Sequence, residues 1–448
     1  MVRTEYYKDL TKMNTFGMKV KARCFMEYDS VADLVDIEFE ELARPVLHIG
    51  GGSNLLFTDD FKGTVLHSKI DFIEILDEAH SAVREKGVEK LNPSHSGEWA
   101  PPTHEAVGGH GFSNPSPEHP DSQSDRTTDC HFDRTTDCHF DRAERVEKSS
   151  SPVLVSVGAG VVFDDFCEWA AKEGLWGVEN LSYIPGEVGA SAVQNIGAYG
   201  VEVKDVIRTV YCYDTVEEEF VNFSVEECRY GYRDSIFKDP EIRGRYIVTH
   251  VVFELSRTPQ PKLEYGNLKN ALDCHPERTS CHPERTSCHP ERSEGSLTPL
   301  QIRKAIIRIR KEKLPEPSVM GSAGSFFKNP VISQEHFARI EAAAKAEHGP
   351  DYTVPHYVIP SVSSVIPSEA EGRVEESLIK IPAAWLIEQC GWKGRRSGNA
   401  AVWDKQPLVI VNYTGEAFPE EIIGLERRII ASVKSKFDIE LHPEVDHI

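Results

Sequence analysis

The sequence has little that would place the protein in a membrane, on a nucleic acid or outside the cell. Across its 448 residues, no apolar run reaches the roughly 20 residues that a transmembrane helix needs, which excludes a helical membrane protein. The 50 lysines and arginines face 72 aspartates and glutamates, and the resulting net charge of −22 argues against nucleic-acid and anionic-membrane partners. The charged N-terminal stretch lacks the apolar core of a signal peptide. We therefore expect a cytoplasmic protein.

A disulfide framework is also missing. Five of the ten cysteines lie in short repeats, and the other five are scattered singly, as reduced core thiols often are. The repeats read DRTTDCHF at 125–132 and 133–140, and CHPERTS at 274–280 and 281–287. They pair Cys with His but offer no C-x-x-C or H-x-x-x-H spacing, so we predict no structural metal site. We interpret them as surface inserts and keep adventitious metal binding as the alternative.

What remains is typical of a mixed α and β protein. We predict inserts at 90–150, 273–297 and 362–376, because these stretches lack apolar residues to bury. Helical or strand-like periodicity recurs between them. Helices are expected over 30–42, 163–172, 298–314, 333–349, 382–392 and 419–437, and strands over 246–255 and 407–413.

Two glycine-rich segments indicate a large ligand. GGGSN at 50–54 follows a buried strand and exposes backbone N–H groups, which suits phosphate, although a plain tight turn is the commoner reading of three glycines. The G-x-G-x-x-G fingerprint is absent, so a Rossmann interpretation is weak. IPGEVGASAVQNIGAYG at 184–200 is nearly uncharged, which suits a long loop wrapped around a ligand.

Three further residues could carry chemistry, but the residues alone leave the choice open. Ser325 lies between small residues and two phenylalanines in SVMGSAGSFFKNP, and a serine in such a place is more often a turn residue. Arg233 in GYRDSIFK is by itself more often a surface ion-pair partner. Glu444 near the C-terminus is by itself a solvated charge.

Six motifs in a fixed order resemble the UDP-N-acetylenolpyruvoylglucosamine reductase (MurB) family. They are NTFG (14–17), GGGSNLLF (50–57), IPGEVGASAVQNIGAYG (184–200), GYRDSIFK (231–238), GSFFKNP (324–330) and PEV (443–445). LEYGNL and GYRDSIF resemble its type I branch, and the resemblance covers nearly all of the chain outside the inserts. It implies an FAD-dependent, NADPH-consuming reduction of UDP-N-acetylglucosamine enolpyruvate to UDP-N-acetylmuramate in peptidoglycan precursor synthesis.

The resemblance also implies the architecture. It predicts an α+β fold with two FAD-binding subdomains, of the PCMH/vanillyl-alcohol-oxidase-like type, and a smaller α+β substrate-binding domain. We expect the first subdomain at 1–68, the second at 69–313 with the C-terminal strand of 437–448 returning to it, and the substrate domain at 314–436. A monomer with small-molecule ligands, and neither nucleic-acid nor membrane partners, is expected.

Finally, the resemblance implies roles for individual residues. Arg233 would bind the substrate carboxylate, as a guanidinium suits a carboxylate. Glu444 would share a hydrogen bond with that carboxylate, which requires one of the two to hold a proton. Ser325 would donate a proton to carbon. Substrate binding would fall to Tyr232, Tyr265, Lys313, Asn329 and Gln389. FAD would be held by Gly50, Gly51, Gly52, Ser53, Asn54, Pro185, Gly186, Gly189, Ala190, Asn195, Ile196, Gly197 and Tyr199.

Two alternatives remain. One is a flavin oxidase of the same broad fold, although such enzymes often attach flavin through His or Cys and neither glycine-rich segment contains one. The other is a metal-binding scaffold built on the Cys-His repeats.

Overall fold

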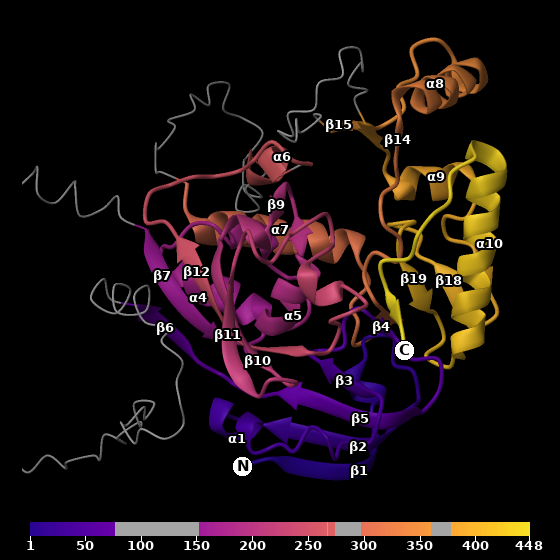
Figure 1. The fold of residues 1–448 in the computed structure, drawn as a ribbon. Helices are drawn as coiled ribbons and strands as arrows, with labels where there is room; N and C mark the ends of the chain where they lie inside the picture. The colour runs from indigo at the N-terminus through magenta and orange to yellow at the C-terminus, as the bar shows by residue number, and fades with distance from the viewer. Residues whose placement is uncertain (77–151, 267, 274–296, 360–377) are drawn as a thin grey trace, which may run out of the picture. The chain divides into compact units, whose positions relative to one another are not determined.

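The computed structural model describes residues 1–76, 152–266, 268–273, 297–359 and 378–448, which belong to one unit (Figure 1). The inserts predicted at 90–150 and 362–376 lie outside the described residues, as does all of 273–297 except its two ends. Within the described residues, no helix is both long enough and apolar enough to cross a bilayer.

The N-terminal sheet delivers the first glycine turn. Its order is β1-β2-β5-β3, with β1 antiparallel to β2 and with β5 parallel to both β2 and β3. Because β3 ends at Ile49, the chain turns at the carboxyl end of this strand into residues 50–54. The strands are β1 (Arg3–Asp9), β2 (Lys21–Tyr28), β3 (Val46–Ile49) and β5 (Phe61–Ser68).

A five-stranded antiparallel sheet carries the second glycine-rich segment. Its apolar side chains pack with those of α4 (Phe163–Lys172) and α5 (Val188–Gln194) in one core cluster, and α5 begins just after Gly186. In spatial order the strands are β11 (Glu219–Ser224), β10 (Ile207–Asp214), β12 (Tyr246–Leu255), β7 (Val153–Gly158) and β6 (Ile73–Leu76).

The C-terminal third contains two small sheets with three helices, and α10 runs alongside β18 and β19 (Figure 1). The first sheet is β13-β19-β18-β17 and the second is β14-β16-β15. The elements are β13 (Gly321–Ser322), β14 (Val331–Ser333), α8 (Gln334–His348), β15 (Tyr357–Ile359), β16 (Leu378–Lys380), α9 (Ala383–Gln389), β17 (Arg396–Ser397), β18 (Ala400–Val402), β19 (Ile410–Asn412) and α10 (Pro419–Phe437).

Short elements connect these parts. They are η1 (Thr11–Met13), α1 (Val31–Val35), β4 (Leu55–Leu56), η2 (Glu179–Leu181), β8 (Gly197–Ala198), β9 (Val201–Glu202), η3 (Val203–Asp205), η4 (Ile236–Lys238), α6 (Leu268–Asp273), α7 (Pro299–Lys313) and β20 (Asp446–His447).

The C-terminal segment lies between two distant parts of the chain. β20 pairs in parallel with β4, and Pro443 forms a bridge with Phe327. The pairing partner of β20 thus lies in the range expected for the first subdomain, while the Asp446 carboxylate lies 3.7 Å from the Arg243 guanidinium in the range expected for the second. The three-part division of the chain stays a prediction.

Two sequence-based expectations were wrong in detail. The helix expected over 30–42 ends at Val35, because Ile37 and Phe39, two residues apart, are both buried beside Tyr28 and cannot share one helix face. The segment 184–200 is not a continuous loop, since it contains α5. A Cβ on Gly189 would lie 2.9 Å from that of Ala159, so small residues here bring the helix close to the sheet. The helices expected at 163–172 and 419–437 and the strand at 246–255 are confirmed.

Candidate active site

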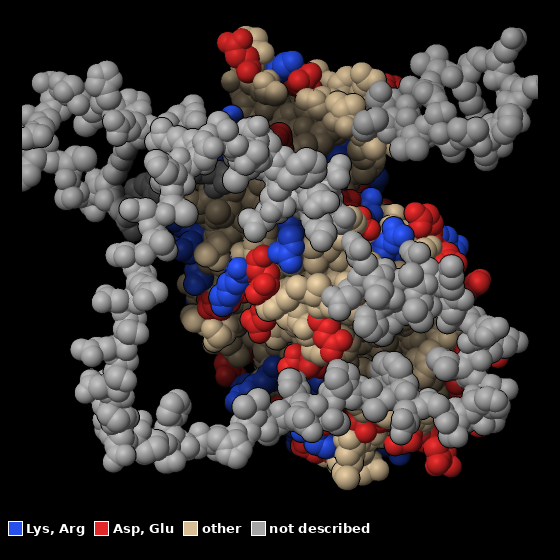
Figure 2. Space-filling model, turned by 90° about the vertical axis from the view of Figure 1, so that its left-hand side faces the viewer, with Lys and Arg blue, Asp and Glu red and all other residues tan. Residues whose placement is uncertain are grey.

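A cavity of about 570 Å³ brings the two glycine-rich segments together with all three predicted catalytic residues. Arg233, Ser325 and Glu444 line it, although they lie far apart in the sequence. Figure 2 shows one outer face of the molecule, on which acidic and basic side chains are interspersed. Predicted cofactor residues that line the cavity are Gly50, Gly51, Gly52, Ser53, Asn54, Pro185, Gly186, Gly189, Ala190, Ile196 and Gly197.

The two glycine-rich segments face each other closely. A Cβ on Gly51 would lie 3.3 Å from the Cα of Gly186, and the Ser53 hydroxyl donates to the Pro185 carbonyl at 3.0 Å. Gly52 has a φ of +61°, and a Cβ there would lie 1.9 Å from the Met13 carbonyl oxygen. Neighbouring backbone therefore excludes a side chain at Gly52 and would crowd one at Gly51.

The first glycine turn suits an anionic group. The backbone N–H groups of Gly51, Gly52 and Ser53 donate to no acceptor among the described residues. Free amides in a glycine turn form a concave donor set that binds phosphate oxygens. The residues present therefore suit the pyrophosphate of a dinucleotide cofactor such as FAD.

Arg233 and Glu444 form a half-buried ion pair in the same cavity. The Arg233 Nε donates to Glu444 Oε1 at 2.8 Å, and its Nη1 and Nη2 donate to the carbonyls of Asn195 and Gly197 at 3.1 and 2.6 Å. Burial raises the pKa of Glu444, although the nearby Arg233 opposes the shift. A carboxyl group that is easier to protonate can lie beside a second carboxylate.

The backbone of Arg233 is held in a sparsely populated conformation. Its φ is +56°, which is uncommon for a residue other than glycine. The turn is fixed by the Asn195 side chain, whose Nδ2 donates to the Gly231 carbonyl at 2.7 Å. Such conformations persist where surrounding contacts determine them, and they cluster at functional sites.

Backbone pairing places Phe326, the residue after Ser325, opposite Glu444. The Glu444 N–H donates to the Phe326 carbonyl at 2.8 Å, and the Lys328 N–H donates to the His442 carbonyl at 2.9 Å. Ser325 is exposed to the cavity, and its hydroxyl has no hydrogen-bond partner among the described residues. It is therefore available to a bound substrate.

Two predicted cofactor residues do not line this cavity. Asn195 is buried and supports the Arg233 turn, as described above. The Tyr199 carbonyl accepts a hydrogen bond from Asn180 Nδ2 at 3.0 Å, and burial raises the pKa of the Tyr199 phenol.

The predicted substrate residues also lie outside the cavity lining. Asn329 Nδ2 donates to the Tyr232 hydroxyl at 3.3 Å, and the Lys380 ammonium lies 3.4 Å from the centre of the Tyr232 ring. The rings of Tyr265 and Tyr357 stack with centroids 5.7 Å apart.

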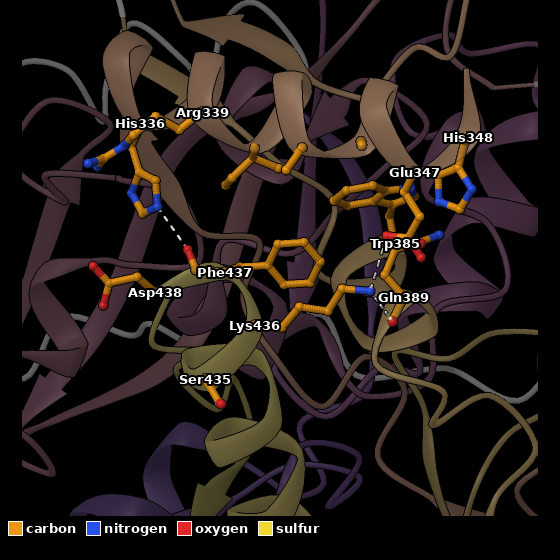
Figure 3. Close-up of a pocket in the computed structure, with 13 residues that line it drawn as sticks. His336, Arg339, Glu347, His348, Trp385, Gln389, Ser435, Lys436, Phe437 and Asp438 are labelled. Carbon is orange, nitrogen blue, oxygen red and sulfur yellow. Dashed lines mark hydrogen bonds and ion pairs between the residues drawn. The ribbon is translucent and has the colours of Figure 1, made fainter. Parts of the chain in front are cut away.

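The remaining two predicted substrate residues lie elsewhere. Lys313 ends α7, and its carbonyl accepts from the Trp403 indole at 2.9 Å. Gln389 lines a different cavity, together with Trp385, Lys436 and Phe437 (Figure 3). There the backbone carbonyl of Gln389 accepts a hydrogen bond from Lys436 Nζ at 3.0 Å. The structure does not bring either residue to the cavity that holds Arg233.

Sequence reasoning missed three cations in the cavity lining, namely Lys238, Arg243 and Arg310. Lys238 Nζ donates to Gln194 Oε1 at 2.9 Å, and burial lowers its pKa. Arg310 donates from Nε to the Tyr183 carbonyl at 3.0 Å. Lys238 closes the GYRDSIFK motif, which was a usable signal. The sequence offers no such signal for Arg310, because its helix carries many basic residues that resemble a solvated face.

Parts of the chain match two domain families. Residues 316–448 match UDP-N-acetylenolpyruvoylglucosamine reductase, C-terminal domain, and residues 138–220 match FAD binding domain.

Proteins named UDP-N-acetylenolpyruvoylglucosamine reductase are similar over nearly the whole chain. The one from Bacteroides fragilis (strain YCH46) is 38% identical over 440 residues, covering 98% of each chain. The one from Porphyromonas gingivalis (strain ATCC 33277) is 35% identical over 452 residues, covering 100% of this chain and 99% of the relative.

A solved structure shares the fold. UDP-N-acetylenolpyruvylglucosamine reductase (MurB) from Thermus caldophilus matches with a TM-score of 0.50 at 19% identity, covering 100% of this chain and 98% of its own. Together with the FAD-binding match, it confirms the α+β fold expected from the sequence.

Proposed function

Because this chain belongs to the UDP-N-acetylenolpyruvoylglucosamine reductase family, we propose that it reduces the enolpyruvyl ether of a UDP-sugar to the lactyl ether, with NADPH as reductant. The chain is an oxidoreductase and carries an FAD-binding domain. The reductant, the substrate contacts and the residue roles below are the proposed part.

FAD, when bound, supplies transfer of a hydride from NADPH to the methylene carbon of the enolpyruvyl group. The turn at Gly51–Ser53 and the facing backbone at Gly186 would hold its pyrophosphate, because free amides and missing side chains are what that group requires. The chain itself must then bind the substrate carboxylate, stabilise the charge that develops and deliver one proton.

Arg233 and Glu444 would handle the substrate carboxylate. Hydride arrival at the methylene carbon leaves an electron pair on the adjacent carbon, delocalised into its carboxylate. Arg233 is held by three hydrogen bonds, so its positive charge is fixed in place before that negative charge develops. Burial raises the pKa of Glu444 and so makes this carboxyl group easier to protonate, and its protonated form can donate a hydrogen bond to the carboxylate.

Ser325 would complete the reaction. Its O–H bond breaks as a new C–H bond forms at the carbon that holds the electron pair, and the alkoxide left behind regains a proton from water. A serine hydroxyl is a weak acid, but the carbanion is a strong base, so the proton transfer is favourable. It is fast when the hydroxyl is held close to the carbon. The Ser325 side chain lines the same cavity as Glu444, one residue before the Phe326 that pairs with Glu444, which supports this role.

The observation that carries the proposal is the meeting of Arg233, Glu444 and Ser325 in the cavity that both glycine-rich segments line. The test is NADPH consumption by the purified full-length protein, with and without the enolpyruvyl UDP-sugar, in air and under nitrogen. Consumption that requires the sugar and ignores oxygen supports the reductase. Sugar-independent consumption that requires oxygen would establish an oxidase instead.

A further inference from the structure

A buried histidine lies between two carboxylates next to the first glycine turn. His67, in β5, is 2% exposed. Its Nδ1 is 3.0 Å from Glu27 Oε1, and its Nε2 is 3.0 Å from Glu187 Oε1. Neither the reaction nor the comparisons assign these three residues a role.

The geometry requires an additional proton. An ionised carboxylate only accepts hydrogen bonds, so two such contacts need an N–H on both ring nitrogens. The ring is therefore an imidazolium, or one carboxyl group is protonated. In either case the trio holds one proton more than a neutral histidine with two carboxylates.

The Glu187 carboxylate reaches the proposed cofactor site. Glu187 lines the cavity and is 7% exposed, and a Cβ on Gly50 would lie 3.2 Å from its Oε2. No described residue donates a hydrogen bond to Oε2. An uncompensated negative charge here would lie next to Gly50, the residue before the amides that suit a pyrophosphate.

Two further titratable groups interact with this trio but carry no positive charge. His48, on β3, also lines the cavity, but burial lowers its pKa to about 4, and its Nε2 is 2.8 Å from the Tyr28 hydroxyl. Burial also raises the pKa of Tyr28, so that phenol stays neutral. Glu27, on β2, adds negative charge. His67 is the basic group in direct contact with Glu187.

We propose that the proton held by His67 and Glu187 controls the affinity for FAD by neutralising the carboxylate beside the glycine turn. This inference rests on the proposed position of the pyrophosphate at Gly51–Ser53. While the proton is present, the turn presents donors and little net charge. When it is lost, the Glu187 carboxylate faces the anionic pyrophosphate and repels it.

The test is the FAD dissociation constant of the full-length apoprotein, measured by quenching of flavin fluorescence between about pH 5 and pH 9, the range that brackets histidine titration. The constant should rise with pH, by up to about tenfold per pH unit where one proton is linked to binding. Glu187→Gln should remove this dependence, because an amide has no charge to neutralise. His67→Gln should weaken FAD binding at every pH, because Glu187 then loses the group that neutralises it.

Glu426→Gln is the matched control. Glu426 is also a buried carboxylate paired with a histidine, His447, at 3.2 Å, but neither residue lines the cavity. This variant should keep the pH dependence of the wild type. Calorimetric titration with FAD in two buffers of different ionisation enthalpy should show proton uptake in the wild type and none in Glu187→Gln.

Gly51→Ala tests the proposed pyrophosphate position separately from the role of His67, because its methyl group would lie close to Gly186. If Gly51→Ala weakens FAD binding but Glu187→Gln keeps the wild-type pH dependence, the His67 inference is overturned and the cofactor position stands. If Gly51→Ala leaves FAD binding unchanged, the cofactor position is wrong and the inference falls with it.

Discussion

Glu444 is half-buried and pairs with Arg233, and burial raises its pKa above the ordinary glutamate value. These properties suit a group that must share a proton with a second carboxylate. Arg233 also donates to the backbone carbonyls of Asn195 and Gly197. Removing the charge of Glu444 therefore leaves Arg233 with two partners, so the turn that contains Arg233 need not collapse.

Glu444→Gln should therefore act on one half of the reaction. Flavin reduction by NADPH should stay close to the wild-type rate, while reoxidation by the enolpyruvyl sugar should slow by roughly 10²-fold or more, because charge stabilisation at the substrate carboxylate is weakened. Rapid-mixing absorbance follows each half separately. Loss of FAD with normal turnover in excess FAD would show instead that Glu444 is structural.

Single residues were the least predictable level from pattern alone. Arg233 and Glu444 are 211 positions apart, and no local periodicity links them. Only the ordered motifs of the family resemblance suggested that they act together. The His67 trio was not predicted at all, because a histidine inside a strand is usually a satisfied core residue and its two partners, Glu27 and Glu187, lie 40 and 120 positions away in the sequence.

At the scale of elements, the turn after β3 depends on missing side chains. Gly52 combines a left-handed backbone with a site where a Cβ would overlap the Met13 carbonyl. Gly174, after α4, has the same left-handed backbone, with a φ of +70°, but no atom lies within 4 Å of its Cβ position. Comparing substitutions at Gly174 and Gly52 therefore distinguishes the cost of a left-handed backbone from the cost of steric overlap.

Gly174→Ala should lower the free energy of unfolding by about 1 kcal/mol, the cost of the left-handed conformation alone. Gly52→Ala should lower it by at least about 2 kcal/mol and weaken FAD binding, because the turn must also move away from Met13. Thermal unfolding and FAD titration measure the two effects. Equal losses in both variants would mean that the turn has room to adjust.

Elements with strong amphipathic periodicity were predicted well, and those shaped by tertiary contacts were not. The helix α10 and the strand β12 have the expected bounds. The helix expected at 30–42 failed because burial of Ile37 and Phe39 overrides local propensity. In 184–200, glycine and alanine were read as ligand-binding loop residues, yet some of them bring α5 close to the sheet.

At the scale of the whole molecule, the largest predicted insert interrupts a paired hairpin. Leu76, the last residue of β6, is the register partner of Leu154 in β7. The two strands therefore meet at the point where the chain leaves and re-enters the sheet, so their pairing does not depend on the length of the connection.

Deletion of residues 90–150 should leave FAD binding and turnover nearly unchanged, because the deleted sequence lacks residues for a core and its flanking strands pair directly. Flavin absorbance of the purified variant and its steady-state rate are the measurements. A folded variant that fails to retain FAD would show that this segment takes part in the site.

The central claim is that Ser325 donates a proton to the substrate carbon adjacent to the methylene group. Its most direct test is the flavin absorbance of Ser325→Ala after rapid mixing. The change removes a hydroxyl without adding bulk, so NADPH should reduce the flavin at close to the wild-type rate. Reoxidation by the enolpyruvyl sugar should slow by roughly 10²–10⁴-fold, the contribution of one general acid, and Ser325→Cys should restore part of it. Equal slowing of both halves, or no slowing of the second, would contradict the account.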